Sequence, residues 1–202
     1  MAGDTRVRMV EAAVGALRRR GVAAMSFTEV LQASGAARGA IYHHFPGGKA
    51  QLVAEAVKVN GSDVRAHFEQ LPAVDPQGAV RAFFDAVRPV IEQSTTGSGC
   101  AVAAVALGAD DDQPQLREVA ASAFASWTEA LAGRLARAGV PEREAAGLAT
   151  TLIMMLEGAH VLCRACGGMD PFDRAVGTAT ALVAASYPAS GGASAVSESC
   201  AT

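Results

Sequence analysis

An arginine, a tyrosine and two histidines crowd one short segment, residues 38–45, which reads RGAIYHHF. The guanidinium of Arg38 can donate two hydrogen bonds to the O6 and N7 atoms of a guanine in the major groove. Tyr42 and His44 carry polar tips on stiff rings, which suit phosphate oxygens at the groove edge. With His43 between them, these residue types indicate contact with double-stranded DNA.

The neighbours of this segment have the properties that such a contact requires. Ala37 and Gly39 are small enough for the backbone to approach base edges closely. Lys49 adds a cation to a predicted helix N-terminus, which already favours anions, and Thr28 stands at a second such position. The sequence therefore predicts a DNA-binding set of Thr28, Ala37, Arg38, Gly39, Tyr42, His43, His44 and Lys49.

Three short helices must position these side chains. Valines and a leucine recur at three- and four-residue steps over residues 7–17, which predicts a helix with one buried face that ends at Gly21. Ser26 and Glu29 fit a capping box and open a second helix of about two turns. We expect the three arginines before Gly21, at positions 18–20, to form a solvated helix end.

The third helix is predicted over about residues 37–45, after a break at Ser34-Gly35 and before Pro46-Gly47-Gly48. Ile41 and Phe45 lie four residues apart and would face inward, against the helix before. Two short helices joined by a tight glycine-containing turn, and stacked on a preceding helix, are typical of a helix-turn-helix DNA-binding unit.

The rest of the chain has helical spacing and almost no strand signal, so the predicted fold class is all-α. We place a helix-turn-helix domain at residues 1–50 and a helical ligand-binding and dimerisation domain at 51–188. Residues 189–202 are small and polar, which predicts a disordered tail. The later helices are expected at about 49–71, 77–94, 101–108, 114–138, 142–166 and 171–187.

Charge is unevenly distributed along the chain, whose net charge is −3. Residues 1–65 contain nine basic and five acidic residues, whereas residues 66–202 contain eight and fifteen. Only the front of the chain is therefore expected to meet a polyanion. A charged N-terminus and the lack of a long uncharged apolar run predict a cytoplasmic protein with no membrane span.

Residues 6–53 resemble the DNA-binding domain of the TetR/AcrR family of bacterial repressors, through the pattern G-x-x-R-G-x-I-Y-H-H-F-x-x-x-K-x-x-L. The resemblance implies a three-helix DNA-binding head, an all-helical ligand and dimer body, and a symmetric operator. It places Thr28, Tyr42 and Lys49 at phosphates, and Arg38 and Gly39 at base edges with His44 nearby. Ala37 departs from the hydroxyl residue that is frequent in the family, which leaves Arg38 as the specificity candidate.

The body is similar to the subgroup of that family that includes the LmrA and YxaF repressors, at Gly99–Leu107, Leu156–Ala159 and Cys163–Ala165. In the family the last two long helices form a four-helix interface in a homodimer. Small residues along both would allow close helix approach, although an alanine-rich composition explains them as well. They are Ala145, Ala146, Gly147, Ala149, Gly158, Ala159, Ala175, Gly177, Ala179 and Ala181.

A small, mostly apolar effector is the ligand that the body predicts. Aromatic residues are only 5% of the chain, so those on the central helices are informative, although each one alone is better explained as core. Together they suit an apolar cavity with a few polar groups that orient the ligand. The candidates are Phe83, Phe84, Phe124, Trp127, Met154, Met155, Glu157 and His160, with Gln93 and Thr128 as further polar contacts.

His160, Cys163 and Cys166 have a spacing that invites comparison with a metal site. The first and last lie about 600° apart on a helical wheel, so the three do not share one face. We therefore expect no metal, and reduced, buried thiols at both cysteines. Redox sensing by the two cysteines is a weaker alternative.

No nucleophile elbow, phosphate loop, dinucleotide-binding glycine motif or paired His/Glu metal motif occurs, so the chain is not predicted to be an enzyme or to hold a cofactor. The favoured interpretation is a repressor that binds a palindromic operator as a dimer and is released by an apolar effector. The alternative is a DNA-binding regulator whose body dimerises and senses a protein partner or the redox state.

Overall fold

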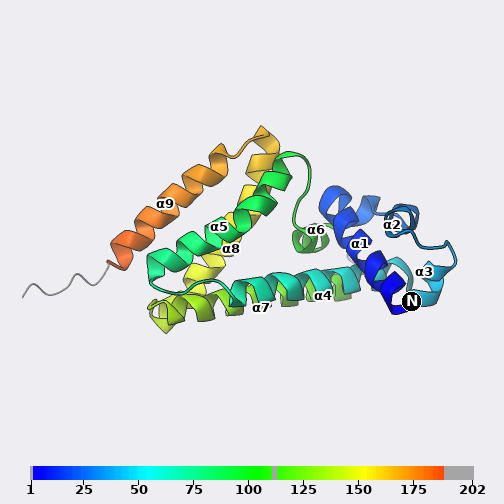
Figure 1. Ribbon diagram of the computed structural model, residues 1–202, viewed down its shortest axis with the longest axis horizontal. Coiled ribbons are helices and arrows are strands. Elements are labelled where there is room, and N and C mark those ends of the chain that lie inside the picture. The colour runs from blue at the N-terminus through cyan, green and yellow to red at the C-terminus, as the bar shows by residue number, and fades with distance from the viewer. Residues whose placement is uncertain (1, 111–112, 189–202) are drawn as a thin grey trace, which may run out of the picture.

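The computed structural model describes residues 2–110 and 113–188, and the predicted tail at 189–202 lies outside that part. These residues form nine α-helices and no strand, so the all-α prediction is confirmed (Figure 1). The helices are α1 (Ala2–Ala24), α2 (Phe27–Ser34), α3 (Ala40–His44), α4 (Gly48–Glu69), α5 (Pro76–Thr95), α6 (Ala101–Gly108), α7 (Pro114–Arg137), α8 (Glu142–Cys166) and α9 (Asp170–Ser186).

The third helix is shorter than the sequence predicts. It begins at Ala40 rather than near Ala37, because Arg38 and Gly39 form a turn in front of it. Its N-cap is Gly39, which offers no side-chain hydrogen bond to the first turn. Ala37 supplies no hydroxyl for that purpose either, and an uncapped start shortens a helix because its first N–H groups stay unsatisfied.

The molecule is elongated, with α1, α2 and α3 at one end and α9 at the other (Figure 1). Helix α4 begins in this head and continues into the body, where it packs along α7. The domain boundary expected at residues 50 and 51 therefore falls inside one continuous helix. Head and body also meet where α1 packs against α6.

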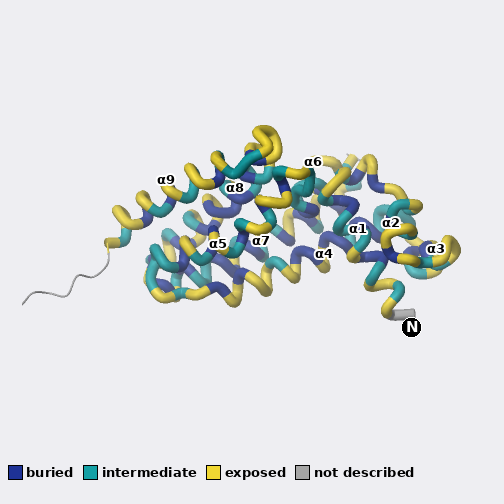
Figure 2. The backbone as a smooth tube through the Cα atoms, turned by 45° about the horizontal axis from the view of Figure 1, so that its top comes forward, coloured by how far each residue is buried: buried dark blue, intermediate teal, exposed yellow. Residues whose placement is uncertain are grey.

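Buried apolar side chains form one continuous core that runs from the head into the body (Figure 2). Met9 and Leu17 of α1, Phe68 of α4 and Trp127 of α7 all belong to it. Because no gap in this core separates the two parts, a change in the body can be transmitted to the head through packed side chains.

Helix α8 is long and apolar enough to cross a membrane by length and composition alone, the one such helix in the part of the chain described. The core helix of a globular protein meets the same test, and α8 packs on α5, α7 and α9. Four of the small residues expected at a dimer interface lie on inward faces of α8 and α9 and are buried within the chain itself. These are Ala145, Ala149, Ala159 and Ala179.

Candidate functional site

The start of α2 is fixed by its cap and by α1. The Ser26 side chain accepts a 3.2 Å hydrogen bond from the Glu29 backbone N–H, which is half of the predicted capping box. The Glu29 carboxylate does not return to Ser26. It pairs instead with Arg19 at 3.2 Å and Arg20 at 3.3 Å, and these contacts tie the end of α1 to the first turn of α2, where Thr28 is exposed.

Helix α3 is held by its two apolar residues, as the sequence predicts. Ile41 and Phe45 are completely buried. The guanidinium of Arg6 lies 5.4 Å from the centre of the Phe45 ring and also pairs with Glu55 of α4. Gly35, with φ 66°, provides the left-handed turn between α2 and α3 that a residue with a side chain rarely adopts.

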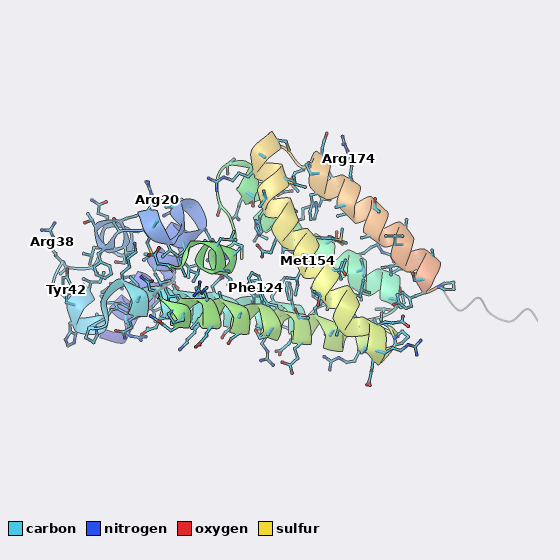
Figure 3. The ribbon with its side chains drawn as sticks, turned by 180° about the vertical axis from the view of Figure 1, so that it is seen from behind. Arg20, Arg38, Tyr42, Phe124, Met154 and Arg174 are labelled. Atoms are coloured by element: carbon cyan, nitrogen blue, oxygen red, sulfur yellow. The ribbon has the colours of Figure 1, made fainter. Side chains whose placement is uncertain are left out.

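The opposite face of α3 and the turn before it are open to solvent. Tyr42 is 66% exposed, and Arg38 and His43 are exposed as well. The Tyr42 and Phe27 rings pack edge to face with their centroids 5.9 Å apart, which fixes the Tyr42 ring and leaves its hydroxyl free of any other described residue. Arg38 likewise has no partner among the residues described, and both side chains lie at the tip of the head (Figure 3).

The remaining predicted DNA-contact residues surround this tip. Ala37 and Gly39 are exposed beside Arg38, and His44 is half-buried with its ring 5.1 Å from that of His43. Lys49, in the first turn of α4, donates a 3.3 Å hydrogen bond from Nζ to the Ala23 carbonyl oxygen. That bond holds the ammonium group near the head rather than extended into solvent.

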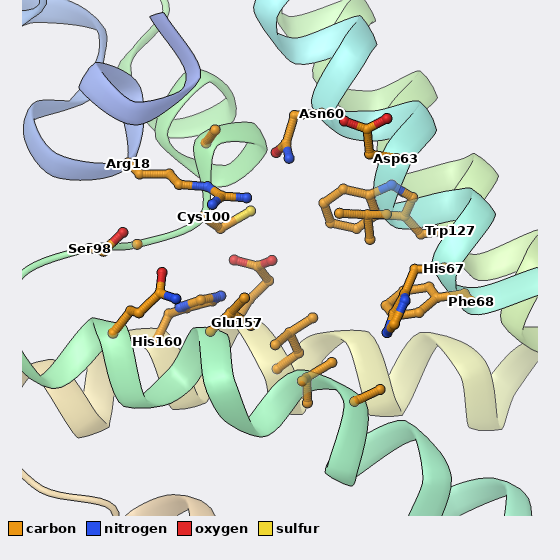
Figure 4. A pocket seen from close by; sticks show the side chains of 18 residues that line it. Arg18, Asn60, Asp63, His67, Phe68, Ser98, Cys100, Trp127, Glu157 and His160 are labelled. Atoms are coloured by element: carbon orange, nitrogen blue, oxygen red, sulfur yellow. The ribbon is translucent and has the colours of Figure 1, made fainter. Parts of the chain in front are cut away.

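A partly open cavity of about 380 Å³ lies between α1, α4, α5, α7, α8 and the segment before α6 (Figure 4). This volume is in the range of small-molecule sites. Trp127 lines it and is held by a 2.8 Å hydrogen bond from its Nε1 to the Gly61 carbonyl oxygen. The apolar part of the wall consists of Val64, Phe68, Ala86, Val87, Val90, Ala101, Trp127 and Leu156.

One carboxyl group is buried in the wall of this cavity. The Oε1 atom of Glu157 is inaccessible and accepts no hydrogen bond from the described residues. Burial raises the pKa of Glu157 to about 7, against a smaller lowering by the Cys100 thiol. Burial and then the Glu157 carboxylate raise the pKa of that thiol, so Cys100 is neutral and not a nucleophile.

His160 and Arg18 form a second polar group in the cavity. The Nδ1 atom of His160 lies 2.6 Å from the hydroxyl of buried Ser94. Burial, and then the positive charge of Arg18, lower the pKa of His160 to about 4, so the imidazole is neutral near pH 7. Arg18 belongs to α1, so the DNA-binding head itself contributes to the wall.

Two family descriptions match this chain over most of its length. Residues 9–56 match the bacterial regulatory proteins of the tetR family, and residues 76–178 match the C-terminal domain of LmrA/YxaF-like transcriptional regulators. The chain belongs to the TetR family. It is a helix-turn-helix transcriptional regulator with an LmrA/YxaF-like body, as predicted, and not an enzyme.

Similar proteins agree with this assignment. An HTH-type transcriptional regulator of Mycobacterium tuberculosis is 36% identical over 173 residues, which cover 83% of this TetR-family chain and 88% of the relative. The regulator YxaF of Bacillus subtilis is 30% identical over 79% of this chain and 85% of its own length. The crystal structure of a TetR transcriptional regulator from Chloroflexus aurantiacus superimposes with a TM-score of 0.75 at 28% identity, over 90% of this chain and 95% of the other.

The structure brings four of the predicted ligand residues to the cavity of this TetR-family regulator and leaves six away from it. Trp127, Glu157, His160 and Gln93 line the wall. Met154 is 69% exposed on the outer face of α8, so it cannot contact a ligand inside the cavity. The others, Phe83, Phe84, Phe124, Met155 and Thr128, lie on helix faces that pack against other helices or away from the space.

Several residues that line the cavity were not among the predicted ligand residues. Arg18 was expected at a solvated helix end with Arg19 and Arg20, yet it is half-buried and faces the cavity, whereas its two neighbours are exposed. Position 18 lies on the same helix face as Val14 and Leu17. This helical spacing could have indicated that Arg18 faces inward. Asn60 and Cys100 offered no comparable signal.

The three cysteines in the described ranges are free thiols, and they differ in their exposure to solvent. Cys163 is buried, Cys166 is exposed and Cys100 borders the cavity. The Cys166 thiol lies 3.2 Å from the Gly168 carbonyl oxygen, at the end of α8, so the expectation of a buried thiol there is wrong. His160 faces Ser94, and the His160, Cys163 and Cys166 side chains do not converge on one point.

Proposed function

We propose that this regulator is a repressor that binds a palindromic operator as a homodimer in the bacterial cytoplasm, and that a small, mostly apolar effector releases it. The observation that carries the proposal is the position of Arg18. This residue belongs to the DNA-binding head, yet it lines the ligand-sized cavity of the body. A ligand in the cavity would therefore contact a residue of the head directly.

The DNA-contact surface in this proposal is the exposed tip of the head. Arg38 would read a guanine edge, and Tyr42 and Thr28 would bind phosphates, because all three are exposed and unpaired among the described residues. Lys49 would add a phosphate contact, and Ala37, Gly39, His43 and His44 would lie against the groove. In a twofold dimer the two recognition helices would stand about 34–36 Å apart, one turn of DNA.

The dimer surface is assigned to α8 and α9 on the basis of an exposed stripe. Gly147, Met154, Gly158 and Val161 follow one another at steps of seven, four and three residues along the outer side of α8, and Leu182 of α9 is also exposed. A Cβ atom added to Gly147, Gly158 or Gly177 would meet nothing within 4 Å. Small residues that face open space beside exposed large apolar ones are suited to a partner helix.

Operator binding is tested first. Wild-type protein should shift the DNA upstream of its own gene in a gel assay, and Arg38→Ala should weaken that binding by about 1–3 kcal/mol. Arg81→Ala is the matched control, because Arg81 is an exposed arginine on α5 with no partner in the described part of the chain. Equal affinities of the two variants would argue against the proposed recognition surface.

Effector release is tested separately. Apolar compounds that raise the melting temperature should include some that dissociate the operator complex, since a ligand acts only through a difference in affinity for the two states. Compounds that bind in the cavity and leave operator affinity unchanged would contradict release by an effector. A protein-sensing or redox-sensing body would show that result.

A further inference from the structure

The polar groups of the cavity are arranged around one unpaired cation. The Arg18 side chain projects from α1 into the cavity (Figure 4). Its guanidinium donates no hydrogen bond and forms no ion pair with any residue in the described ranges. A guanidinium is always charged near pH 7, and its five N–H groups need acceptors when water is displaced by a ligand.

The acidic residues of the cavity do not neutralise this cation. Asp63 is exposed at the rim, on α4. Glu157 lies deeper, and it forms no ion pair with Arg18. The positive charge of Arg18 acts on His160, whose Nδ1 atom lies 2.6 Å from the Ser94 hydroxyl. His67 is exposed at the rim, four residues along α4 from Asp63.

The wall across from Arg18 is apolar and includes two aromatic rings (Figure 4). The Phe68 and Trp127 rings contact each other edge to face, with centroids 6.3 Å apart, and both line the space. Val87 and Val90 of α5 complete this side. An apolar skeleton placed here would pack against these side chains, whereas a small hydrophilic anion would leave the wall unfilled.

We propose that the effector is an amphipathic organic anion whose apolar body packs against Phe68 and Trp127 and whose single acid group pairs with Arg18. This assignment rests on the proposed function, because it takes the cavity to be the effector site. A hydroxyl or N–H on the ligand would satisfy the buried Oε1 atom of Glu157.

The acid group would be held directly by the head. The Gly99 backbone N–H donates a 2.8 Å hydrogen bond to the Arg18 carbonyl oxygen, and Gly99 also lines the cavity. The next residues along α1, Arg19 and Arg20, pair with Glu29 of α2. Movement of Arg18 toward a bound anion would therefore shift the helix that positions α2.

The test uses two dyes with the same aromatic skeleton. Anilinonaphthalene sulfonate carries an acid group, and N-phenylnaphthylamine is its neutral counterpart. Energy transfer from Trp127, the single tryptophan of the chain, reports dye in the cavity. Arg18→Gln removes the charge, and Arg19→Gln is the matched control because Arg19 is the exposed neighbour outside this cavity.

Arg18→Gln should weaken binding of the sulfonate about tenfold or more and leave binding of the neutral dye within about twofold, because a charged hydrogen bond is lost only with the anion. Arg19→Gln should change neither dye. Unchanged sulfonate binding in Arg18→Gln would overturn the proposal, and so would equal losses for both dyes. Retained binding of the neutral dye also shows that the variant is folded.

The outcome is separable from that of the proposed function. If the sulfonate binds through Arg18 but does not weaken operator binding, release by an effector fails while the ligand class stands. If another compound releases the operator and Arg18→Gln leaves its action unchanged, the repressor proposal stands and the anion assignment fails.

Discussion

The backbone N–H of Gly99 donates a 2.8 Å hydrogen bond to the carbonyl oxygen of Arg18. This contact joins the segment before α6 to the last regular turn of α1, at the border of the cavity. An ordered backbone contact of this kind transmits displacement because neither group can move alone without leaving a polar atom unpaired. The head and the cavity are thus mechanically connected at this residue pair.

Gly21 forms a kink near the end of α1, and its replacement by alanine should destabilise the protein. Its φ of 72° and ψ of −178° belong to a region that is essentially restricted to glycine. A Cβ atom there would meet nothing within 4 Å, so the cost is backbone strain alone. Gly21→Ala should lower the free energy of unfolding in urea by about 1–3 kcal/mol.

The control for that substitution is Gly133→Ala in α7. Its Cβ would lie 3.7 Å from the flexible end of Arg137, and its backbone is helical. Alanine should stabilise this position by about 0.5–1 kcal/mol. Equal effects of the two substitutions would show that conformation at Gly21 is not the decisive factor.

Tyr42→Phe should weaken operator binding without affecting the fold. The hydroxyl is exposed, and the ring contact with Phe27 at 5.9 Å is retained by phenylalanine. The loss should be about 0.5–1.5 kcal/mol and similar for all DNA sequences, because phosphate contacts carry no sequence information. Fluorescence anisotropy at several salt concentrations measures it.

The salt dependence separates Tyr42 from Lys49. A hydroxyl releases no counterion, so Tyr42→Phe should leave the slope of log affinity against log salt unchanged. Lys49→Gln should reduce that slope by about 1. A reduced slope in Tyr42→Phe would contradict a neutral hydrogen bond to phosphate.

Met154→Lys should prevent dimerisation and leave the protomer folded. Met154 is 69% exposed on α8, so a lysine there is solvated in a monomer but would be buried without a partner in the proposed dimer. The dimer dissociation constant should rise at least about tenfold, as measured by light scattering after size-exclusion chromatography.

Leu107→Lys provides the comparison for this experiment. Leu107 is 86% exposed on α6, away from the α8 and α9 surface. Its substitution should leave the mass in solution unchanged. Dissociation in Leu107→Lys but not in Met154→Lys would move the interface away from α8.

Glu157 should make the protein less stable as the pH rises. The folded protein raises the pKa of Glu157 from 4.5 to about 7, mainly through burial, so the folded state binds more protons between these values than the unfolded state. Stability from the neutral carboxyl is complete below about pH 4.5 and is lost as the pH passes 7. Glu157→Gln should therefore gain about 1–3 kcal/mol over wild type at about pH 8, and less at about pH 5.

His160 should act in the opposite direction. Burial and the charge of Arg18 lower its pKa from 6.5 to about 4, so the unfolded state binds more protons and stability is lost as the pH falls from about 6.5 to 4. His160→Gln should flatten this acid limb in urea unfolding experiments. A steeper acid limb in the variant would contradict a neutral, buried imidazole.

Most of the helix-turn-helix tip could be predicted from the sequence, because the patterns that indicate it are local. Ser26 opens α2 and Ile41 and Phe45 are buried, as their types and spacing indicate. The same reasoning missed the turn at Arg38 and Gly39, since a helix start without a capping side chain depends on weak energies. It also predicted the wrong partner for the Glu29 side chain, because the arginines that pair with Glu29 belong to another helix.

The sequence by itself determined the all-helical architecture, the family and the exposed tip that holds Arg38 and Tyr42, because capping, turns and helical periodicity act over a few residues. Only the tertiary structure decided which side chains meet around the cavity. Met154 and Glu157 lie three residues apart on α8, yet one faces solvent and the other turns a buried carboxyl oxygen toward the cavity, since the packing of α8 against its neighbours selects the face. Arg18 reaches the cavity for the same reason: helical spacing could indicate its inward face, but only the packing of α1 on α6 decided that this face borders the cavity.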